Sequence, residues 1–556
     1  MSRSLSAFYR PGLLIMSVFF LGAVYFSGCR NREDEDRNKT VFRYNEAAGI
    51  TSLDPAFARD QANIWATHQL FSGLLQLNDR LDILPCIAWG WSISGNGKEY
   101  RFYLRKDVYF HDDPVFPGGK GRRVVAGDFV YSFNRIVDPR TASPGAWVFG
   151  AVDTSGGHYA FSAPDDTTFE ILLSKPFPPF LGLLTTLYCS VVPEEAIVKY
   201  GQDFRRHPVG TGPFLFRYWK EGVKLVLGKN PGYFETEQGV RLPYLDAIAI
   251  TFVPDKQSAF LEFVKGSLDF MSGIDPSYKD EVLTREGSLK PAYAGRINLI
   301  RGPYLNTEYL GFLVDPNSAI SRGSPTGSLK VRQAINYSFD RKKMIRFLRN
   351  NIGTPGIYGM IPPGMPDCDT SAVYYSYDPD RTRKLLEEAG YPGGKGLPPI
   401  TLSTTSDYLD ICKYIQSRAG ELGIELKIDI SPPAALKEMK AQARLPFFRA
   451  SWIADYPDAE TYFSLFCTRN FCPAGPNYTH FSDPRYDLLY DVAQSTDDDA
   501  LRHNCYRQMD RLVMQDAPVV VLYYDEVLRF VQKNISGLGC DPMNLLTLKT
   551  VRKRNR

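Results

Sequence analysis

Helix-type and strand-type hydrophobic patterns alternate along the whole chain, and this alternation limits the possible folds more than any other feature. The segment 101–105 alternates as a strand does, with Phe102 and Leu104 on one side, and the segments 169–173, 223–227 and 247–253 are also predicted to be strands. Helical patterns accompany them, and the first places on one face Ile64, His68, Phe71 and Leu75. Interspersed helices and strands build layered α/β domains, whereas bundles and sandwiches each use one kind of element. The sequence therefore predicts an α/β fold.

Two helices can be placed from the residues at their ends. Asp378 is followed by Pro379, and Gly390 comes after the last apolar position of the segment. An acidic N-cap, a first-turn proline and a glycine beyond the last turn are the residues that helix ends prefer. This predicts a helix between 378 and 390. Asp128 is the predicted N-cap of a second helix, which carries Phe129, Phe133 and Ile136.

The N-terminus indicates where the protein works. Arg3 and Arg10 precede an apolar run over 13–28, which is short for a membrane span and typical of a signal segment. The run ends in small residues directly before Cys29, as in the lipobox of bacterial lipoproteins, although Phe26 stands where that box usually has an aliphatic residue. We expect a signal segment at 1–29, a lipidated Cys29 and a charged tether at 30–39. The alternative is an uncleaved anchor in which Cys29 is an ordinary thiol. Either way, the mature protein is expected outside the cytoplasmic membrane, in the periplasm or an equivalent space.

Composition fits a large binding domain without nucleic acid. The 556 residues are enough for two or three hydrophobic cores, and a net charge of +3 does not indicate nucleic-acid binding. Cys467 and Cys472 are close in sequence and are predicted to form a disulfide outside the cytoplasm. The pairing of the other cysteines stays open. A zinc site is not expected, because no second close pair of cysteines or histidines completes four ligands.

The segment 449–458 is the strongest candidate for ligand binding. It places Arg449, Trp452 and Asp455 within seven positions. A carboxylate beside an aromatic ring can hold an ammonium group through charge-assisted hydrogen bonds and a cation–π contact. The alternative is a strand that runs into a turn, with Trp452 in the core and Asp455 as a turn residue. The ten residues alone leave both interpretations open.

Motifs for catalysis or nucleotide binding are missing. The glycine-rich loops 117–121 and 392–396 contain lysine but lack the spacing of a phosphate-binding loop. The glycine turn 207–214 leads into a strand, whereas a dinucleotide fingerprint leads into a helix. The six histidines are dispersed, and neither a zinc-protease nor a serine-hydrolase motif occurs. The missing motifs make an enzyme less expected, although an enzyme without them is not excluded.

Short segments spread along the chain, taken together, indicate a family. They are 52–55, 70–75, 85–89, 100–112, 126–133, 208–214, 230–233, 331–341, 377–380, 388–391, 452–458 and 517–523. In this order they resemble the extracellular solute-binding proteins of family 5, which are the oligopeptide- and dipeptide-binding components of ABC transporters. The resemblance extends from about residue 41 to about residue 538.

The resemblance implies a bilobed periplasmic-binding-protein fold, of type II and similar to cluster C, that closes on its ligand about a hinge. Such proteins split one lobe along the chain and pack an extra domain beside it. Carried over, the split first lobe takes 40–80, 205–300 and 524–556, the extra domain takes 81–204, and the second lobe takes 301–523. The implied partners are a short peptide and an ABC transporter permease. A monomer attached to a bacterial membrane by its lipid is expected.

The resemblance also implies roles for individual residues. Asp455 matches the acid that holds a peptide's α-ammonium, and Trp452 matches the tryptophan of the same motif. Arg449 matches a basic residue that meets the carboxylate of a short peptide. Either Tyr523 or Tyr524 matches a tyrosine that lines the site. Arg59 is a departure, because the oligopeptide binders have a glutamate there, and a basic side chain at this position favours acidic or differently placed ligands.

Other functions stay open at this point. A member of the same family could bind a metal complex, haem or an oligosaccharide instead of a peptide. A peptide sensor without a permease would use the same site. An extracytoplasmic peptidase is a further alternative, but it needs a nucleophile or a metal that the sequence does not offer.

Overall fold

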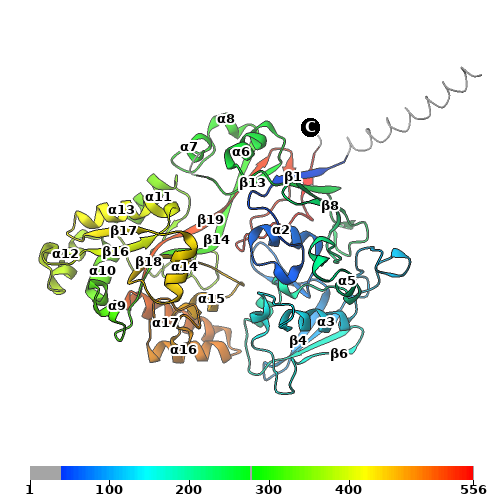
Figure 1. Ribbon diagram of the computed structural model, residues 1–556, viewed down its shortest axis with the longest axis horizontal. Helices are drawn as coiled ribbons and strands as arrows, with labels where there is room; N and C mark the ends of the chain where they lie inside the picture. The colour runs from blue at the N-terminus through cyan, green and yellow to red at the C-terminus, as the bar shows by residue number, and fades with distance from the viewer. Residues whose placement is uncertain (1–38, 276–277, 555–556) are drawn as a thin grey trace, which may run out of the picture.

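A computed structural model describes residues 39–275 and 278–554, and it shows two bodies joined by two long strands (Figure 1). These strands are β14 (Ile297–Phe312) and β19 (Val519–Gln532). One sheet of eleven strands runs through both bodies, in the order β17-β16-β18-β14-β19-β13-β1-β12-β9-β8, with β15 (Thr354–Pro355) beside β19. Cys29 and the predicted signal segment lie outside the described residues.

The first lobe contains one end of this sheet. Its central strand β1 (Val41–Asn45) runs parallel to β12 (Ala247–Thr251), with Val41 opposite Ala247. The remaining strands are β8 (Phe214–Lys220), β9 (Lys224–Lys229) and β13 (Phe270–Ser272). Two predicted strand patterns, 223–227 and 247–253, are confirmed by β9 and β12. The C-terminal residues lie beside β1 (Figure 1), where Lys553 Nζ donates to the Val41 carbonyl at 2.8 Å.

An extra domain packs against this lobe. Its sheet contains β4 (Ala88–Ile93), β5 (Glu99–Leu104), β7 (Thr168–Leu172) and β6 (Phe161–Asp165), in that order. The helix α3 (Ala126–Val137) covers the inner face, where the rings of Phe133 and Phe169 meet edge-on at 5.3 Å. Both lobe and domain contribute to one hydrophobic core. Asp54 and Arg135 strengthen this junction with a buried ion pair of 2.5 Å.

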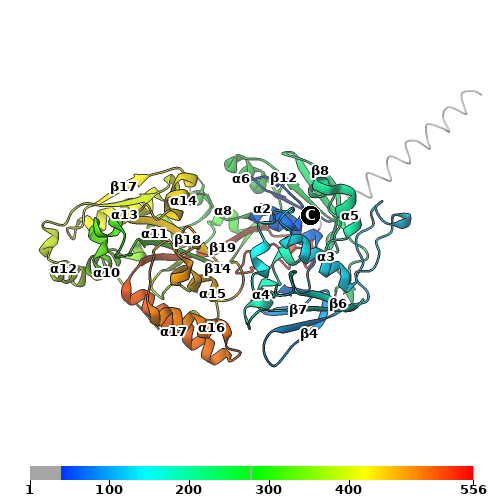
Figure 2. The same ribbon diagram turned by 60° about the horizontal axis from the view of Figure 1, so that its bottom comes forward.

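The second lobe is a sheet covered by helices on both faces (Figure 2). Its strands beyond β14 and β19 are β18 (Phe447–Ile453), β16 (Ile400–Thr404) and β17 (Leu426–Ile430). One face packs on α10 (Leu329–Tyr337), α11 (Arg341–Leu348), α12 (Pro379–Glu388) and α13 (Leu409–Gly420). The other packs on α15 (Glu460–Phe463), α16 (Pro484–Ser495) and α17 (Asp499–Asp516).

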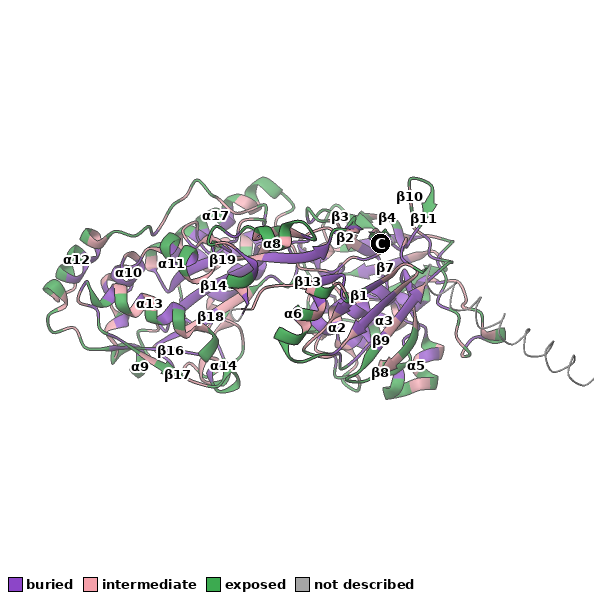
Figure 3. Cartoon of the chain, turned by 90° about the horizontal axis from the view of Figure 1, so that it is seen from above, coloured by how far each residue is buried: buried purple, intermediate pink, exposed green. Residues whose placement is uncertain are grey.

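The connection between the two bodies is a pair of antiparallel strands. The strands β14 and β19 are paired along most of their length, and the register shifts between Pro303 and Thr307. Figure 3 shows these largely buried strands passing from one body to the other. The predicted boundaries after residues 300 and 523 fall inside them. A small unit of α6 (Lys256–Lys265), α7 (Lys279–Val282) and α8 (Pro291–Ala294) packs where the pair enters the first lobe.

Three local predictions need correction. The helix α2 (Gln61–Leu70) ends before Phe71, because the Leu70 carbonyl accepts the N–H of Gly212 at 2.9 Å and the chain continues extended. Asp128 is not the N-cap of α3. It lies in the first turn, and its carboxylate accepts the N–H of Val125 at 2.8 Å.

The predicted disulfide is also wrong. Cys467 and Cys472 are both free thiols in the structure, and both are buried. The Cys472 thiol lies instead 3.3 Å from His480 Nε2 and 3.4 Å from the Lys440 carbonyl oxygen. Neighbouring polar atoms therefore satisfy the Cys472 sulfur without a covalent bond.

Candidate functional site

A cavity of about 480 Å³ lies between the two bodies. The first lobe contributes the start of α2 and the loop before it, and the extra domain contributes Trp147 and Tyr188. The second lobe contributes the residues that follow β18, among them Asp455. Tyr304, which lies in β14, and Asn544, near the C-terminus, complete the walls. A cavity lined by both bodies can change shape when they move relative to one another.

Asp455 reaches the cavity because β18 ends two residues before it. The Trp452 Nε1–H donates to Thr461 Oγ1 at 3.1 Å, and the Asp455 N–H lies 3.5 Å from the same oxygen. This turn fixes the backbone of Asp455, and its side chain keeps access to water. The surrounding walls displace much of the water, and this desolvation raises the pKa of Asp455 to about 6. The local structure is a strand that runs into a turn, and it fits both interpretations of the segment.

Arg59 lines the same cavity from the first lobe. It follows a short 3-10 turn, Pro55–Phe57, which Asp54 caps by accepting the N–H of Ala56 at 3.0 Å. The next residue, Asp60, caps α2 through the N–H of Asn63 at 3.1 Å. Two consecutive caps therefore hold the backbone on both sides of Arg59, which lines the cavity.

Aromatic side chains from the extra domain line the cavity together with Asp455 and Arg59. Burial and, to a smaller extent, the negative charge of Asp455 raise the pKa of Tyr188 to about 12, and the positive charge of Arg59 opposes the shift. Both charges therefore act on one hydroxyl group. Trp147 packs against Tyr456 with ring centroids 6.3 Å apart. These contacts bring the extra domain to the turn that carries Asp455.

Arg449 lies inside the second lobe, on the face of β18 opposite to Trp452. Its guanidinium forms a 2.5 Å ion pair with Glu308, whose side chain is only 3% exposed. The same guanidinium stacks 3.4 Å from the ring centroid of Tyr408, and the Tyr408 hydroxyl donates to Glu308 at 3.2 Å. The structure therefore places Arg449 in an internal cluster and not beside Asp455.

The two candidate tyrosines face opposite sides of β19. Tyr523 is buried against Arg349, which donates to its hydroxyl at 2.9 Å and lies 4.1 Å from its ring centroid. Tyr524 is buried on the other face, where its hydroxyl donates to the Gly359 carbonyl at 2.7 Å and accepts the N–H of Tyr358. Neither tyrosine lines the cavity of Asp455.

Comparison with known proteins decides the family. The model of the bacterial extracellular solute-binding proteins, family 5 Middle, matches residues 82–471. The chain belongs to this family. Its sequence is 25% identical over 484 residues to the dipeptide-binding protein of Escherichia coli K12, with 83% of this chain and 84% of the relative covered. It is also 25% identical over 501 residues to the glutathione-binding protein GsiB of Salmonella choleraesuis, with 89% and 91% covered.

Solved structures confirm the predicted bilobed type II fold. The periplasmic binding protein DppA from Helicobacter pylori in complex with the peptide STSA matches with a TM-score of 0.73 at 24% identity. The match covers 94% of this chain and 99% of the DppA chain. HbpA2 from Haemophilus parasuis matches with a TM-score of 0.79 at 21% identity, covering 92% and 100%. Members of family 5 bind solutes outside the cytoplasm, as the N-terminus predicted. Within the described residues, no helix is long and apolar enough to cross a membrane.

A second cavity adjoins the first one and lies along the first lobe and the connecting strands. It measures about 360 Å³ and shares Trp65, Tyr304 and Asn544 with the first. Glu46 and Asp525 line its far part. Asp525 is paired with Arg349 at 2.7 Å, and desolvation raises the pKa of Glu46. A ligand longer than the first cavity therefore has room to continue along the first lobe and the connecting strands.

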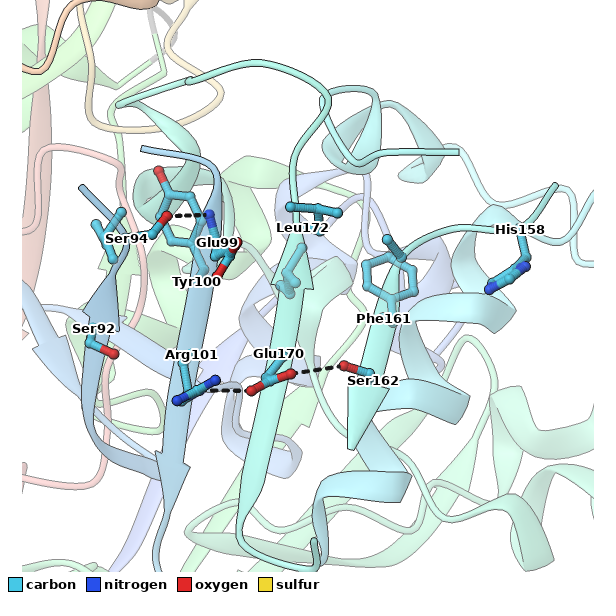
Figure 4. Close-up of a pocket in the computed structure, with 13 residues that line it drawn as sticks. Ser92, Ser94, Glu99, Tyr100, Arg101, His158, Phe161, Ser162, Glu170 and Leu172 are labelled. Atoms are coloured by element: carbon cyan, nitrogen blue, oxygen red, sulfur yellow. Dashed lines mark hydrogen bonds and ion pairs between the residues drawn. The ribbon is translucent and has the colours of Figure 1, made fainter. Parts of the chain in front are cut away.

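The hollow on the outer sheet of the extra domain differs from this site in its electrostatics. It measures about 540 Å³ and is lined by β4, β5, β6 and β7. Figure 4 shows that its charged side chains bind one another: Arg101 Nε donates to Glu170 at 2.7 Å, and Ser162 Oγ donates to the same carboxylate at 3.2 Å. These groups already satisfy one another, so the interlobe cavity is the better candidate for a charged ligand.

Sequence reasoning missed the residues that surround Asp455. Tyr188, Trp147, Tyr304 and Asn544 come from four distant parts of the chain. No local pattern distinguishes them from other buried aromatic and turn residues. Their signal is purely tertiary, since only the folded chain brings them to one cavity.

Proposed function

We propose that this member of family 5 is the substrate-binding component of a peptide ABC transporter. The observation that carries the proposal is the position of Asp455 in the interlobe cavity. Within the described parts of the chain, its carboxylate forms no ion pair. A carboxylate held in a partly dehydrated cavity, among aromatic rings, is suited to receive a peptide's α-ammonium.

Binding, without turnover, explains how such a site works. The ammonium restores to Asp455 the favourable interactions that the cavity walls remove, and the rings of Tyr188 and Trp147 cover the ligand. Closure of the two bodies about β14 and β19 then buries the ligand. The closed form is the state that a permease would recognise.

The other residues predicted to contact the ligand would either have to change their partners or act on it indirectly. Arg449 stays a prediction for the peptide carboxylate, and it would have to exchange Glu308 for that carboxylate. Tyr523 and Tyr524 would contribute through the packing of β19, since both hydroxyls are already bonded. Trp452 supports Asp455 through Thr461.

The finer aspects of localisation are also proposals. Lipidation of Cys29 would attach the protein to a bacterial membrane, and residues 30–39 would connect it to β1. One lipid chain gives only marginal anchoring, so more than one acyl chain is expected for stable attachment. A monomer without cofactor or catalytic activity is sufficient for this role.

Isothermal titration calorimetry with tri-alanine tests the proposed function. The native protein should bind tri-alanine, and Asp455→Asn should weaken this binding by on the order of thirtyfold or more, since breaking a buried charge pair costs about 2–5 kcal/mol. Asp497→Asn, an exposed carboxylate elsewhere in the second lobe, is the matched control and should bind as the wild type does. Native mass spectrometry of the purified protein should find a co-purified peptide. Equal affinity of Asp455→Asn and the wild type would contradict the proposal.

A further inference from the structure

The interlobe cavity is lined by three charged side chains, Arg59 and Asp60 from the first lobe and Asp455 from the second. Within the described parts of the chain, neither Arg59 nor Asp455 takes part in an ion pair. Charged groups of the second lobe and of the connecting strands are paired, as in Arg449 with Glu308 at 2.5 Å and Arg349 with Asp525 at 2.7 Å. Arg59 and Asp455 therefore carry charges from opposite sides of the cavity that a ligand can pair with.

The two charges also lie at the same end of the cavity. All three charges of the cavity act on the Tyr188 hydroxyl: Asp455 and Asp60 raise its pKa, and Arg59 lowers it. Asp60, the next acid in the chain, uses both carboxylate oxygens within its own helix, at 3.1 Å to the Asn63 N–H and 2.9 Å to Asn63 Nδ2. It is thus engaged in capping α2. A small group placed beside Tyr188 would meet a guanidinium on one side and a carboxylate on the other.

We propose that this cavity recognises a head group that carries an ammonium and a carboxylate on one carbon, as in a free amino acid or a γ-linked peptide. Asp455 receives the ammonium, and Arg59 receives the carboxylate through its planar pair of N–H donors. The assignment of the ammonium rests on the proposed function, and the assignment of the carboxylate to Arg59 goes beyond it.

The same geometry selects against ordinary α-linked peptides. In such a peptide, the carbon that bears the ammonium is followed by an amide, which offers Arg59 no negative charge. The guanidinium would then lie near the ammonium without a counter-ion, and like charges repel. A γ-linked head group leaves neither Arg59 nor Asp455 unpaired. The volume of about 480 Å³ lies within the range that small-molecule sites occupy.

A pair of isomeric dipeptides tests this inference. γ-Glutamyl-alanine and α-glutamyl-alanine have the same atoms and the same net charge, but only the γ isomer carries the ammonium and a carboxylate on one carbon. Calorimetry should show the γ isomer binding to the wild type at least about tenfold more tightly, since a charge-assisted bidentate contact is gained. Arg59→Gln should remove this preference by weakening γ-glutamyl-alanine, with α-glutamyl-alanine changed less than about threefold. Arg346→Gln, an exposed arginine outside the cavity, should keep the preference.

The outcomes separate this inference from the proposed function. Equal affinity of the wild type for the two isomers, or a preference that survives Arg59→Gln, would overturn the role of Arg59 while tri-alanine binding through Asp455 could still hold. Loss of discrimination in Arg59→Gln together with folded-state circular dichroism identical to the wild type supports it. If tri-alanine and both dipeptides fail to bind the wild type, the peptide-binding function itself is refuted.

Discussion

Peptide affinity should depend on pH through Asp455. Desolvation raises the pKa of this carboxyl to about 6 in the unliganded protein, so it is ionised in about nine molecules of ten at pH 7 and about one in ten at pH 5. Only the ionised form pairs with an ammonium, and the ammonium in turn lowers the pKa of Asp455 in the complex. The apparent affinity for tri-alanine should therefore fall about tenfold between pH 7 and pH 5.

Calorimetry between pH 5 and pH 8 checks this expectation. Titrations below pH 7, repeated in buffers of different ionisation enthalpy, should also show that binding releases a proton. Asp455→Asn supplies the control, because its weaker affinity should change little over the same range. A wild-type affinity that stays constant from pH 7 to pH 5, with no proton released, would refute the assignment of Asp455 as the ammonium site.

Three further predictions follow from particular contacts. The pKa of Asp455 is higher in the folded protein than in the unfolded chain, so its ionisation opposes folding as pH rises through about 6. Asp455→Asn should therefore have a higher melting temperature than the wild type at pH 7.5 and the same melting temperature at pH 4. A lower melting temperature of the variant at pH 7.5 would indicate that Asp455 is a structural turn residue. Glu308→Gln leaves Arg449 without its buried partner and should reduce the free energy of unfolding by about 3–5 kcal/mol in urea titrations; a loss below about 1 kcal/mol would show that the pair is not structurally important. Iodoacetamide should label both Cys467 and Cys472 in unreduced, denatured protein, and a peptide pair that stays linked in the mass spectrum would contradict the free thiols.

Much of the fold could be predicted where local chemistry determines it. The helix α12 begins after its N-cap Asp378 with Pro379 in the first turn, and Gly390 follows it with a φ of 88°. A left-handed residue at that place suits glycine best, and this is why the sequence marks the end of the helix clearly. The strand patterns of β5, β7, β9 and β12 were equally clear, because each strand buries one face or lies within a sheet.

Predictions failed where distant segments decide the local structure. The apolar pattern through Phe71 and Leu75 continues the face of α2, but the helix ends at Leu70, where the glycine turn near Gly210 packs against its last residue. A Cβ at Gly210 would lie 2.1 Å from the Leu70 carbonyl oxygen, so only glycine allows this approach. The spacing of Cys467 and Cys472 likewise suggested a disulfide that the fold does not form. Such contacts join parts of the chain that a local reading treats separately.

The candidate site, like the fold, could be predicted from the sequence only in part. The segment of Asp455 was visible in the sequence, because a carboxylate, a tryptophan and an arginine lie within seven positions. The sequence did not show that Arg449 is paired with Glu308 inside the second lobe or that Arg59 shares a cavity with Asp455. Contacts between segments far apart in the sequence decide those positions.

A cycle of two changes tests the central claim most directly: Asp455→Asn in the protein and N-acetylation of tri-alanine in the ligand. Both changes remove the same proposed ion pair, so calorimetry on the four combinations measures the coupling between the Asp455 carboxylate and the α-ammonium. Each change alone should weaken binding by at least about thirtyfold, and making both should cost little more than either one, which gives a coupling energy of about 2 kcal/mol or more. Fully additive effects, or acetylated tri-alanine that binds the wild type as tightly as the free peptide, would contradict the account.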